Sequence, residues 1–207
     1  LDAEIVRDNA LAVSGLLVEK IGGPSVFPYH PKGLWQELNN RPNYSRTYKQ
    51  DKGEKLYRRS LYTYWKRTVP PPSMATFDAP EREFCLVRRS RTNTPLQAFV
   101  MLHDPQFVEA ARHLAERMMS ASDNPDGCIE HGFRLATSRL PNNKEKVVLH
   151  RLFRERLLFY RKDKKAAKAV LSVGESIRKV TLSEPEQAAW TTVARALLNL
   201  SETISKN

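Results

Sequence analysis

The stretch TPLQAFVMLHDPQFVEAARHLAERM, residues 94–118, decides the fold class. Thr94 and Asp104 each stand directly before a proline, and this pair is a typical helix start, because the proline has no amide that needs a partner. Gln97 can complete a capping box with Thr94. Apolar residues then recur every three or four positions, the spacing of one helix face; they are Phe107, Val108, Ala111, Leu114, Ala115 and Met118. We therefore predict two consecutive helices.

The same periodicity extends to both sides of this stretch. It predicts helices near residues 2–21, 53–68, 125–139, 142–161, 163–173 and 183–200, with one helical turn at 33–38. Capping pairs support two of them, Asn142 with Glu145 and Ser183 with Glu186. No alternating strand pattern appears, so we predict an all-α fold, an irregular bundle of roughly six to eight helices. Prolines and aromatic residues fill a long loop after the first helix.

We expect residues 1–207 to form a single all-α domain, a fragment of a larger multidomain protein, with a subdivision near 120–142 as the alternative. The chain begins with Leu1 and shows no signal peptide. It contains no apolar run of the roughly 20 residues needed to span a bilayer.

The 34 Lys and Arg against 23 Asp and Glu give a net charge of +11, concentrated in two blocks at residues 41–91 and 144–179. The first block interleaves aromatic side chains with cations, as protein surfaces that bind nucleic acid do. We interpret the second, around residues 161–165, as a solvated turn. Nucleic-acid binding is the less favoured interpretation of these blocks, because no helix-turn-helix, zinc-finger or RNA-binding signature accompanies the charge.

Three arginines precede the helix start at Thr94. A helix N-terminus together with guanidinium groups can hold a carboxylate, sulfate or phosphate. The alternative, which we favour, is that these arginines pair with the nearby Asp78, Glu81 and Glu83. The candidate anion-binding residues are Arg88, Arg89, Arg91, Asn93, Arg59 and Tyr62.

Other chemistry has weaker support in the sequence. Cys128 and His131 lie one helical turn apart, but a structural zinc site needs four ligands and no second pair has suitable spacing, so we predict no metal site. No haem-attachment motif is present, so we expect no cofactor in this chain. Cys85 and Cys128 could form a disulfide or remain free thiols. No catalytic residue is identified, and the enzyme question stays open.

Three stretches together resemble a known family: LDAEIVRDNALAVSGLLVEKIGG at 1–23, GEKLYRRSLYTYWKRTVPPPSM at 53–74, and FDAPEREFCLVRRSRTNTPLQAFVMLHDPQF at 77–107. Residues 132–200 fit as well. The family is the planctomycete-specific C-terminal domain of unknown function (domain of unknown function 1553), found in proteins that carry cytochrome-c-like domains. The resemblance implies an exported bacterial parent protein, periplasmic or at the cell surface, with haem c in another domain and none in this one. It supplies no known catalytic residue.

These observations favour a non-catalytic helical module that packs against the other domains of the same polypeptide. The first alternative is a half-site for an acidic or sulfated carbohydrate, using Arg88, Arg89, Arg91 and Tyr62 together with Glu81 or Asp78. The second alternative is nucleic-acid binding through the basic blocks.

Overall fold

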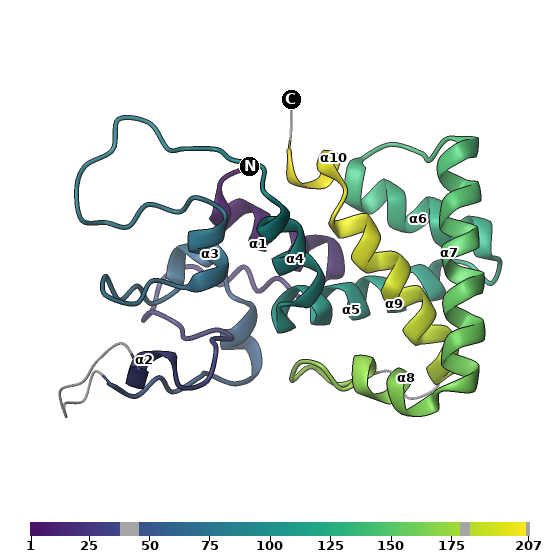
Figure 1. Ribbon diagram of the computed structural model, residues 1–207, viewed down its shortest axis with the longest axis horizontal. Coiled ribbons are helices and arrows are strands. Elements are labelled where there is room, and N and C mark those ends of the chain that lie inside the picture. Colours follow the sequence, from purple (N-terminus) through teal and green to yellow (C-terminus); the bar gives the residue numbers. More distant parts are fainter. Residues whose placement is uncertain (38–45, 179–182, 206–207) are drawn as a thin grey trace. The chain divides into compact units, whose positions relative to one another are not determined.

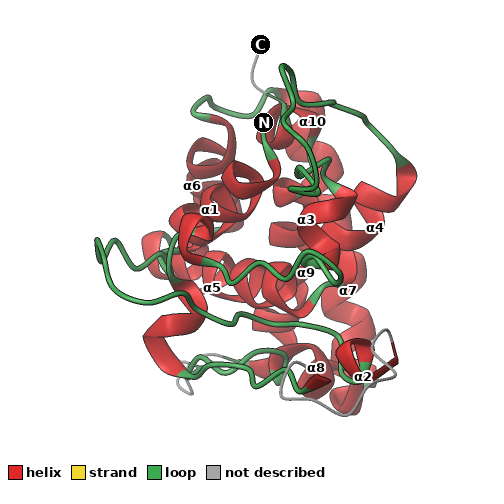
Figure 2. Ribbon diagram, turned by 90° about the vertical axis from the view of Figure 1, so that its left-hand side faces the viewer, coloured by secondary structure: helices red, strands yellow, loops and turns green. Residues whose placement is uncertain are grey.

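A computed structural model describes residues 1–37, 46–178 and 183–205. The described chain is helical and contains no sheet, as Figure 2 shows in red and green. The all-α prediction is therefore confirmed. The helices are α1 Ala3–Ser14, α2 Leu34–Glu37, α3 Pro72–Thr76, α4 Pro95–His103, α5 Pro105–Ala121, α6 Pro125–Thr137, α7 Asn143–Lys162, α8 Lys164–Leu171, α9 Glu184–Leu198 and α10 Ser201–Ile204.

The chain divides into two compact units. The first unit comprises residues 1–9 and 17–100, and the second comprises residues 10–16 and 101–207. The stretch 120–142 lies inside the second unit, between the end of α5 and the start of α7. The single domain over residues 1–207 stays a prediction.

The second unit is built around α9, which packs against both α5 and α7 (Figure 1). Small side chains on α9 let the helices approach closely, and the Trp190 ring stacks on Phe153 with centroids 4.1 Å apart. Each fully buried large apolar side chain contributes roughly 1.5–3 kcal/mol. The buried residues of α9 include Ala188, Ala189, Trp190, Val193, Ala194, Leu197 and Leu198.

Helix starts in this unit agree closely with the sequence. The Asp104 carboxylate accepts a hydrogen bond from the Gln106 amide at 2.9 Å, which caps α5. Asn142 and Glu145 form the predicted capping box at the start of α7. The predicted box at Ser183 and Glu186 is wrong, because the Ser183 side chain makes no capping hydrogen bond at α9.

A charged network lies in the core of the second unit. Arg112, Glu109 and Glu116 on α5 have almost fully buried side chains, exposed by 1%, 0% and 3%. The Arg112 guanidinium donates to the Glu116 carboxylate at 3.3 Å and to the Ser176 carbonyl oxygen at 2.9 Å. Glu116 also accepts from the Gln187 amide at 2.7 Å, which links α5 to α9. The network therefore fixes three parts of the unit to one another.

Ser176 occupies the end of this network. Its amide and hydroxyl both donate to Glu109 Oε1, at 2.7 and 2.6 Å, and its hydroxyl also contacts the Arg112 guanidinium and His113 Nε2. The hydroxyl proton is thus committed to a buried carboxylate and both lone pairs have donors. This arrangement makes Ser176 an anchor for the chain after α8. Gly174 belongs to the same anchor, because a Cβ there would lie 2.2 Å from Glu109 Cδ.

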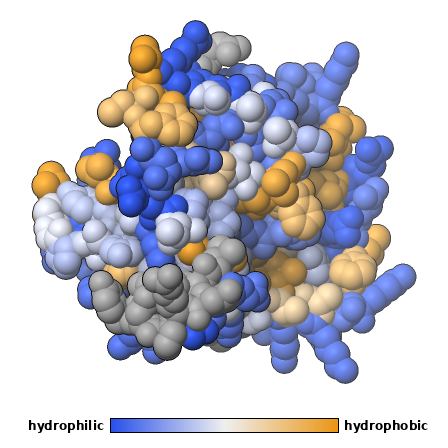
Figure 3. All heavy atoms as spheres, turned by 60° about the vertical axis from the view of Figure 1, so that its left-hand side comes forward, coloured by the Kyte–Doolittle hydropathy of each residue, from blue (hydrophilic) through white to orange (hydrophobic). Residues whose placement is uncertain are grey.

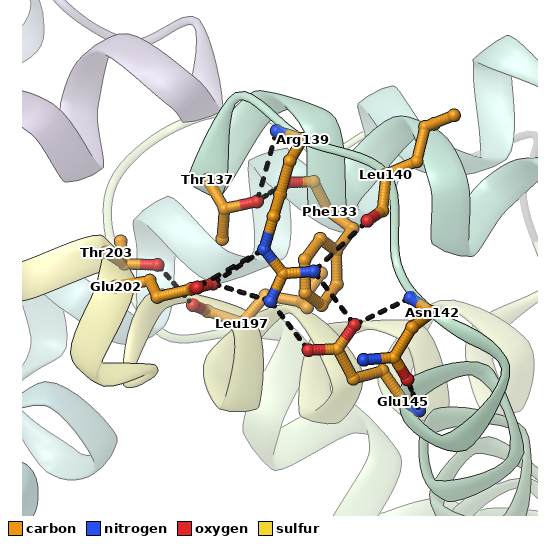
Figure 4. A network of polar contacts seen from close by, with 9 residues as sticks. All are labelled: Phe133, Thr137, Arg139, Leu140, Asn142, Glu145, Leu197, Glu202 and Thr203. Carbon is orange, nitrogen blue, oxygen red and sulfur yellow. Dashed lines mark hydrogen bonds and ion pairs between the residues drawn. The ribbon is translucent and has the colours of Figure 1, made fainter.

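Arg139 links three segments at another edge of the second unit (Figure 4). Its Nη2 lies 2.7 Å from Glu145 Oε1 at the start of α7 and 2.8 Å from Glu202 Oε2 on α10. The guanidinium also covers the Phe133 ring, 4.7 Å from its centroid. The hydrogen bond from Arg139 lowers the pKa of the Glu145 carboxyl, more than its partial burial raises it.

We expect Arg139→Gln to loosen α10, because Glu202 on that helix then loses the guanidinium with which it pairs. Amide exchange at Thr203 and Ser205, both hydrogen-bonded within α10, should become severalfold faster at neutral pH. The pKa of Glu145 is depressed in the folded state, so its stabilisation is present above the ordinary carboxyl value of 4.5 and is lost as pH falls through the folded value. The part of the stability difference between variant and parent that comes from the Arg139–Glu145 pair should therefore shrink in acid. The exposed Arg154→Gln is the control, and equal exchange rates in both variants would contradict this role.

The first unit contains little helix. Two of the helices expected in the N-terminal half of the chain are wrong in length or type. The first helix ends at Ser14 rather than near residue 21, because Gly15 adopts a left-handed φ of 77°. Residues 53–68 form two short 3₁₀ turns, Gly53–Tyr57 and Ser60–Tyr62, instead of one helix. The backbone groups of this segment bond elsewhere: Val18 donates to the Tyr57 carbonyl at 3.0 Å, and Val26 to that of Tyr62 at 2.8 Å.

An aromatic cluster holds the predicted loop after α1. Phe27 stacks on Tyr64 at 4.7 Å between centroids, and His30 stacks on Tyr48 at 4.5 Å. Trp35 of α2 packs edge-on against Tyr48 at 5.1 Å. Burial raises the pKa of the Tyr48 hydroxyl and lowers that of His30, so both side chains are held neutral. Aromatic side chains therefore pack the described part of this loop; residues 38–45 lie outside the described residues.

Candidate functional site

The candidate site is built on two neighbouring residues of α1. The buried Arg7 side chain donates to the carbonyl oxygens of Leu56 and Arg58, both at 2.7 Å, and to the Ser60 hydroxyl at 3.2 Å. Asp8 accepts from the Ser60 amide at 2.8 Å and from its hydroxyl at 2.7 Å. These bonds hold the segment 56–60 against α1 and give the site a rigid wall.

A pocket of about 230 Å³ opens beside this wall, within the first unit. Its apolar part comes from Ile5, Leu61, Met74 and the Trp65 ring. The guanidinium of Arg82 lies over that ring, 4.5 Å from its centroid. The charged residues lining the pocket are Asp2, Glu4, Asp8, Arg59, Arg82 and Arg89.

Ion pairs connect these charged residues. Arg89 Nη1 lies 2.8 Å from Glu4 Oε2 and 3.7 Å from Asp2 Oδ2. Arg91 Nη2 lies 3.5 Å from Asp2 Oδ1, and Arg59 Nε lies 3.9 Å from Asp8 Oδ2. The side chains of Arg59 and Arg91 are well exposed, so each of these pairs contributes little to stability.

The three arginines and three carboxylates that line the pocket cancel in charge. An anion entering it would compete with Glu4, Asp2 and Asp8 for the guanidinium groups of Arg89 and Arg59. A neutral or mixed-charge surface can instead exchange these ion pairs one for one while covering the apolar floor. The arrangement therefore suits contact with another protein surface better than capture of a free anion.

The six candidate anion-binding residues do not all lie at this pocket. Arg59 and Arg89 line the pocket, and Arg91 lies at its Asp2 side. Arg88 and Asn93 are exposed and do not line it. Tyr62 also lies elsewhere: its hydroxyl accepts from the Gly22 amide at 2.8 Å, and the Arg58 guanidinium covers its ring at 3.8 Å.

The favoured alternative, in which the arginines pair with Asp78, Glu81 and Glu83, is wrong for Arg89 and Arg91. Both arginines pair with acids of the chain's first four residues. Asp78 instead accepts from the amide and hydroxyl of Thr92, at 2.7 and 2.8 Å, and Glu83 faces Arg67 at 3.7 Å. Sequence proximity was therefore a poor guide to pairing.

Sequence reasoning missed the carboxylates Asp2, Glu4 and Asp8 and the pair formed by Trp65 and Arg82. One signal could have found the acids. Residues 1–40 carry a net negative charge directly before the strongly basic block, and Glu4 and Asp8 lie one helical turn apart. Complementary charge between neighbouring segments indicates pairing between them.

Two further sequence questions concern cysteine. Both Cys85 and Cys128 are free thiols in the structure. Burial, with help from Glu186 and Asp123, raises the pKa of the Cys128 thiol to about 11, so it is protonated at neutral pH. Burial and the nearby Arg117 and Arg134 lower the pKa of His131.

Within the described ranges, no group of three or more His, Cys, Asp or Glu side chains could hold a metal ion. Across residues 1–37, 46–178 and 183–205, no helix is both long enough and apolar enough to span a bilayer.

Comparison with known proteins gives one match. The model of the family PSD1, described as "Protein of unknown function (DUF1553)", matches residues 1–153. Those residues include the whole first unit and the second unit as far as the middle of α7, whereas residues 154–207 lie outside the match. No curated protein and no solved structure matches the chain. Because the match covers well over half of its length, the chain belongs to the PSD1 family of proteins of unknown function, DUF1553.

Proposed function

We propose that this chain is a helical module that docks against other domains of a larger protein. The docking surface is the segment of residues 80–94, here called the arm, together with the adjoining pocket. The observation that carries the proposal is a run of exposed apolar side chains on the arm. Phe84 is 67% exposed, Leu86 46% and Val87 107%, and Cys85 between them is exposed as well.

Single exposed apolar side chains are common on protein surfaces and need no explanation, but a continuous run of four is a feature of interaction sites. Figure 3 shows one face of the molecule, where hydrophobic side chains form separate groups among hydrophilic ones. Covering the arm would remove apolar surface from water at roughly 25 cal/mol per Å². This gain supports a protein surface as the partner.

The arm is also held in place before any partner binds. Figure 1 shows it as the long loop between α3 and α4. Its polar residues bind other parts of the first unit, through Arg89 with Glu4 and Thr92 with Asp78, while the side chains of Phe84, Leu86 and Val87 stay largely exposed. A segment fixed in this way loses little conformational entropy when it binds.

The family resemblance supports other domains of the same polypeptide as the partner, among them a cytochrome-c-like domain that carries haem c. It also supports an exported location. An acidic or sulfated carbohydrate has less support, because Arg59, Arg89 and Arg91 already face carboxylates.

Hydrogen–deuterium exchange in the full-length gene product and in the 207-residue chain tests the docking. We expect the amides of residues 80–94 to exchange at least tenfold more slowly in the full-length protein, because a partner domain covers the arm. Residues 20–25, a loop of the same unit, should exchange equally in both.

A matched pair of variants separates docking from general stabilisation. Val87→Ser should abolish the protection of the arm, whereas Ile21→Ser, at a residue 88% exposed in the same unit, should leave it unchanged. Equal exchange of the arm in the two proteins would overturn the proposal. Protection by an added sulfated oligosaccharide, with none from the other domains, would replace it with the carbohydrate alternative.

A further inference from the structure

The second basic block forms a continuous cationic surface on α7 and α8, here called the ridge. Its members lie on the solvent side of the second unit and are exposed. α7 has 20 residues, so the ridge extends for about 30 Å along that helix. The cations of the ridge are Lys144, Arg151, Arg154, Arg161, Lys162, Lys164, Lys165 and Lys168.

The ridge differs from the first basic block in lacking internal partners. Arg151 lies 3.9 Å from Glu155, one turn along the same helix. In the part of the chain that the structure describes, none of the other seven cations pairs with an acidic side chain. In the first block, by contrast, Arg59, Arg89 and Arg91 each face a carboxylate. In the described part of the chain, seven of the eight ridge cations are therefore left without a carboxylate partner.

Apolar side chains stand among these cations on the same helix face. Val147 is 66% exposed, Val148 53%, Leu158 59% and Phe159 46%. At 3.6 residues per turn, Val147 and Leu158 lie on one side of the line joining Arg151 and Lys162, and Val148 and Phe159 lie on the other. A helix that merely faced water would gain nothing from aliphatic residues at these positions.

The opposite side of α7 fixes the orientation of the ridge. Leu149, Phe153 and Tyr160 are buried, and the Phe153 ring stacks on Trp190 of α9. Figure 1 shows α9 running along one side of α7. The ridge is therefore a preformed surface that cannot turn its apolar residues inward.

We propose that the ridge binds the surface of an anionic phospholipid bilayer. Lipid phosphates complement its unpaired cations, and the boundary between headgroups and acyl chains accepts aliphatic and aromatic side chains. A nucleic acid would complement the cations of the ridge but not its apolar side chains. Stacking on bases needs aromatic rings, and the ridge offers mainly Val and Leu beside its charges. The observations therefore favour a lipid surface over nucleic acid.

This binding is peripheral and involves no span of the bilayer. It uses the second unit alone, so it goes beyond the proposed docking of the arm, and either can fail without the other. Its attraction is electrostatic at long range and weakens as salt shortens the Debye length.

Sedimentation with lipid vesicles tests the proposal on the 207-residue chain. We expect binding to vesicles of phosphatidylcholine that contain about one quarter phosphatidylglycerol, and none to pure phosphatidylcholine. The quadruple variant Arg154→Gln, Lys162→Gln, Lys164→Gln, Lys165→Gln should bind far more weakly, at about fivefold per charge removed.

The matched control removes the same charge from exposed lysines of the first unit, through Lys20→Gln, Lys32→Gln, Lys49→Gln and Lys52→Gln. It should retain nearly all vesicle binding. All substituted residues are exposed, so circular dichroism should show both variants folded. Equal losses in the two variants would mean that net charge alone drives binding, and would overturn the ridge as a site.

A third variant distinguishes a bilayer from a nucleic acid. Val147→Ser with Leu158→Ser leaves the charge unchanged and should weaken vesicle binding about tenfold, because apolar contact with the interface is lost. Binding to a short DNA duplex would be unaffected by this change. If the chain binds the duplex more tightly than the vesicles, or if this variant binds vesicles as well as the parent does, the membrane proposal is wrong.

Discussion

Replacing Arg112 with leucine is expected to remove about 3–5 kcal/mol from the free energy of unfolding of the second unit. Arg112 lies in a buried group with Glu109 and Glu116, whose side chains are exposed by 0% and 3%. Without it, two carboxylates remain in the core with their main cationic partner gone. Urea unfolding followed by circular dichroism reports this loss, since most of the helix lies in the second unit.

Two further variants show whether charge or packing causes the effect. Arg154→Leu removes an exposed arginine and should change stability by less than about 0.5 kcal/mol. Replacing Arg112, Glu109 and Glu116 together by leucine should recover much of the loss, because no uncompensated buried charge is left. If Arg112→Leu costs less than about 1 kcal/mol, the network does not carry the stability assigned to it.

The second large effect is expected at Arg7. Its guanidinium, in a residue only 2% exposed, donates to two carbonyl oxygens and one hydroxyl of the segment 56–60. A hydrogen bond from a charged group contributes roughly 1.5–3 kcal/mol, and the carbonyls would be left buried without a donor. Arg7→Leu should therefore cost the first unit about 3–5 kcal/mol. Amide exchange over residues 54–63 should rise to the rate of the unfolded chain.

Arg7→Lys separates charge from geometry, because lysine keeps the charge but lacks the planar fork that reaches two carbonyls at once. We expect Arg7→Lys to lower the free energy of unfolding by more than half of the decrease expected for Arg7→Leu. Arg59→Leu serves as the control. It removes a side chain with half of its surface exposed, so it should change the free energy of unfolding little. Full stability in Arg7→Lys would show that the fork is unnecessary.

Local signals predicted most of the second unit. Asp104 before Pro105 and Asn142 with Glu145 mark helix starts that the structure reproduces, because capping depends on residues that are close in sequence. Ser183 failed as a capping residue although its sequence pattern is similar. The pattern shows that a cap can form, and the neighbouring tertiary contacts decide whether it does.

The first unit depends on contacts between distant residues, and its sequence was correspondingly misleading. Tyr57, Leu61, Tyr64 and Trp65 have helical spacing, yet the segment is irregular because Arg7 and Val18 take up its backbone groups. The partners of Arg89 lie 85 and 87 positions away, at Glu4 and Asp2. No periodicity within a segment can reveal such pairs.

The most direct test of the proposed docking is site-specific photocrosslinking in the full-length gene product. A benzoylphenylalanine at position 87, which is fully exposed in this chain, should form a cross-link to a residue outside the 207-residue chain and within the same polypeptide. The same probe at position 21, also exposed and in the same unit, should form none. If position 87 forms no cross-link outside the chain, or both positions form the same ones, the arm is not a docking surface and the proposed function is wrong.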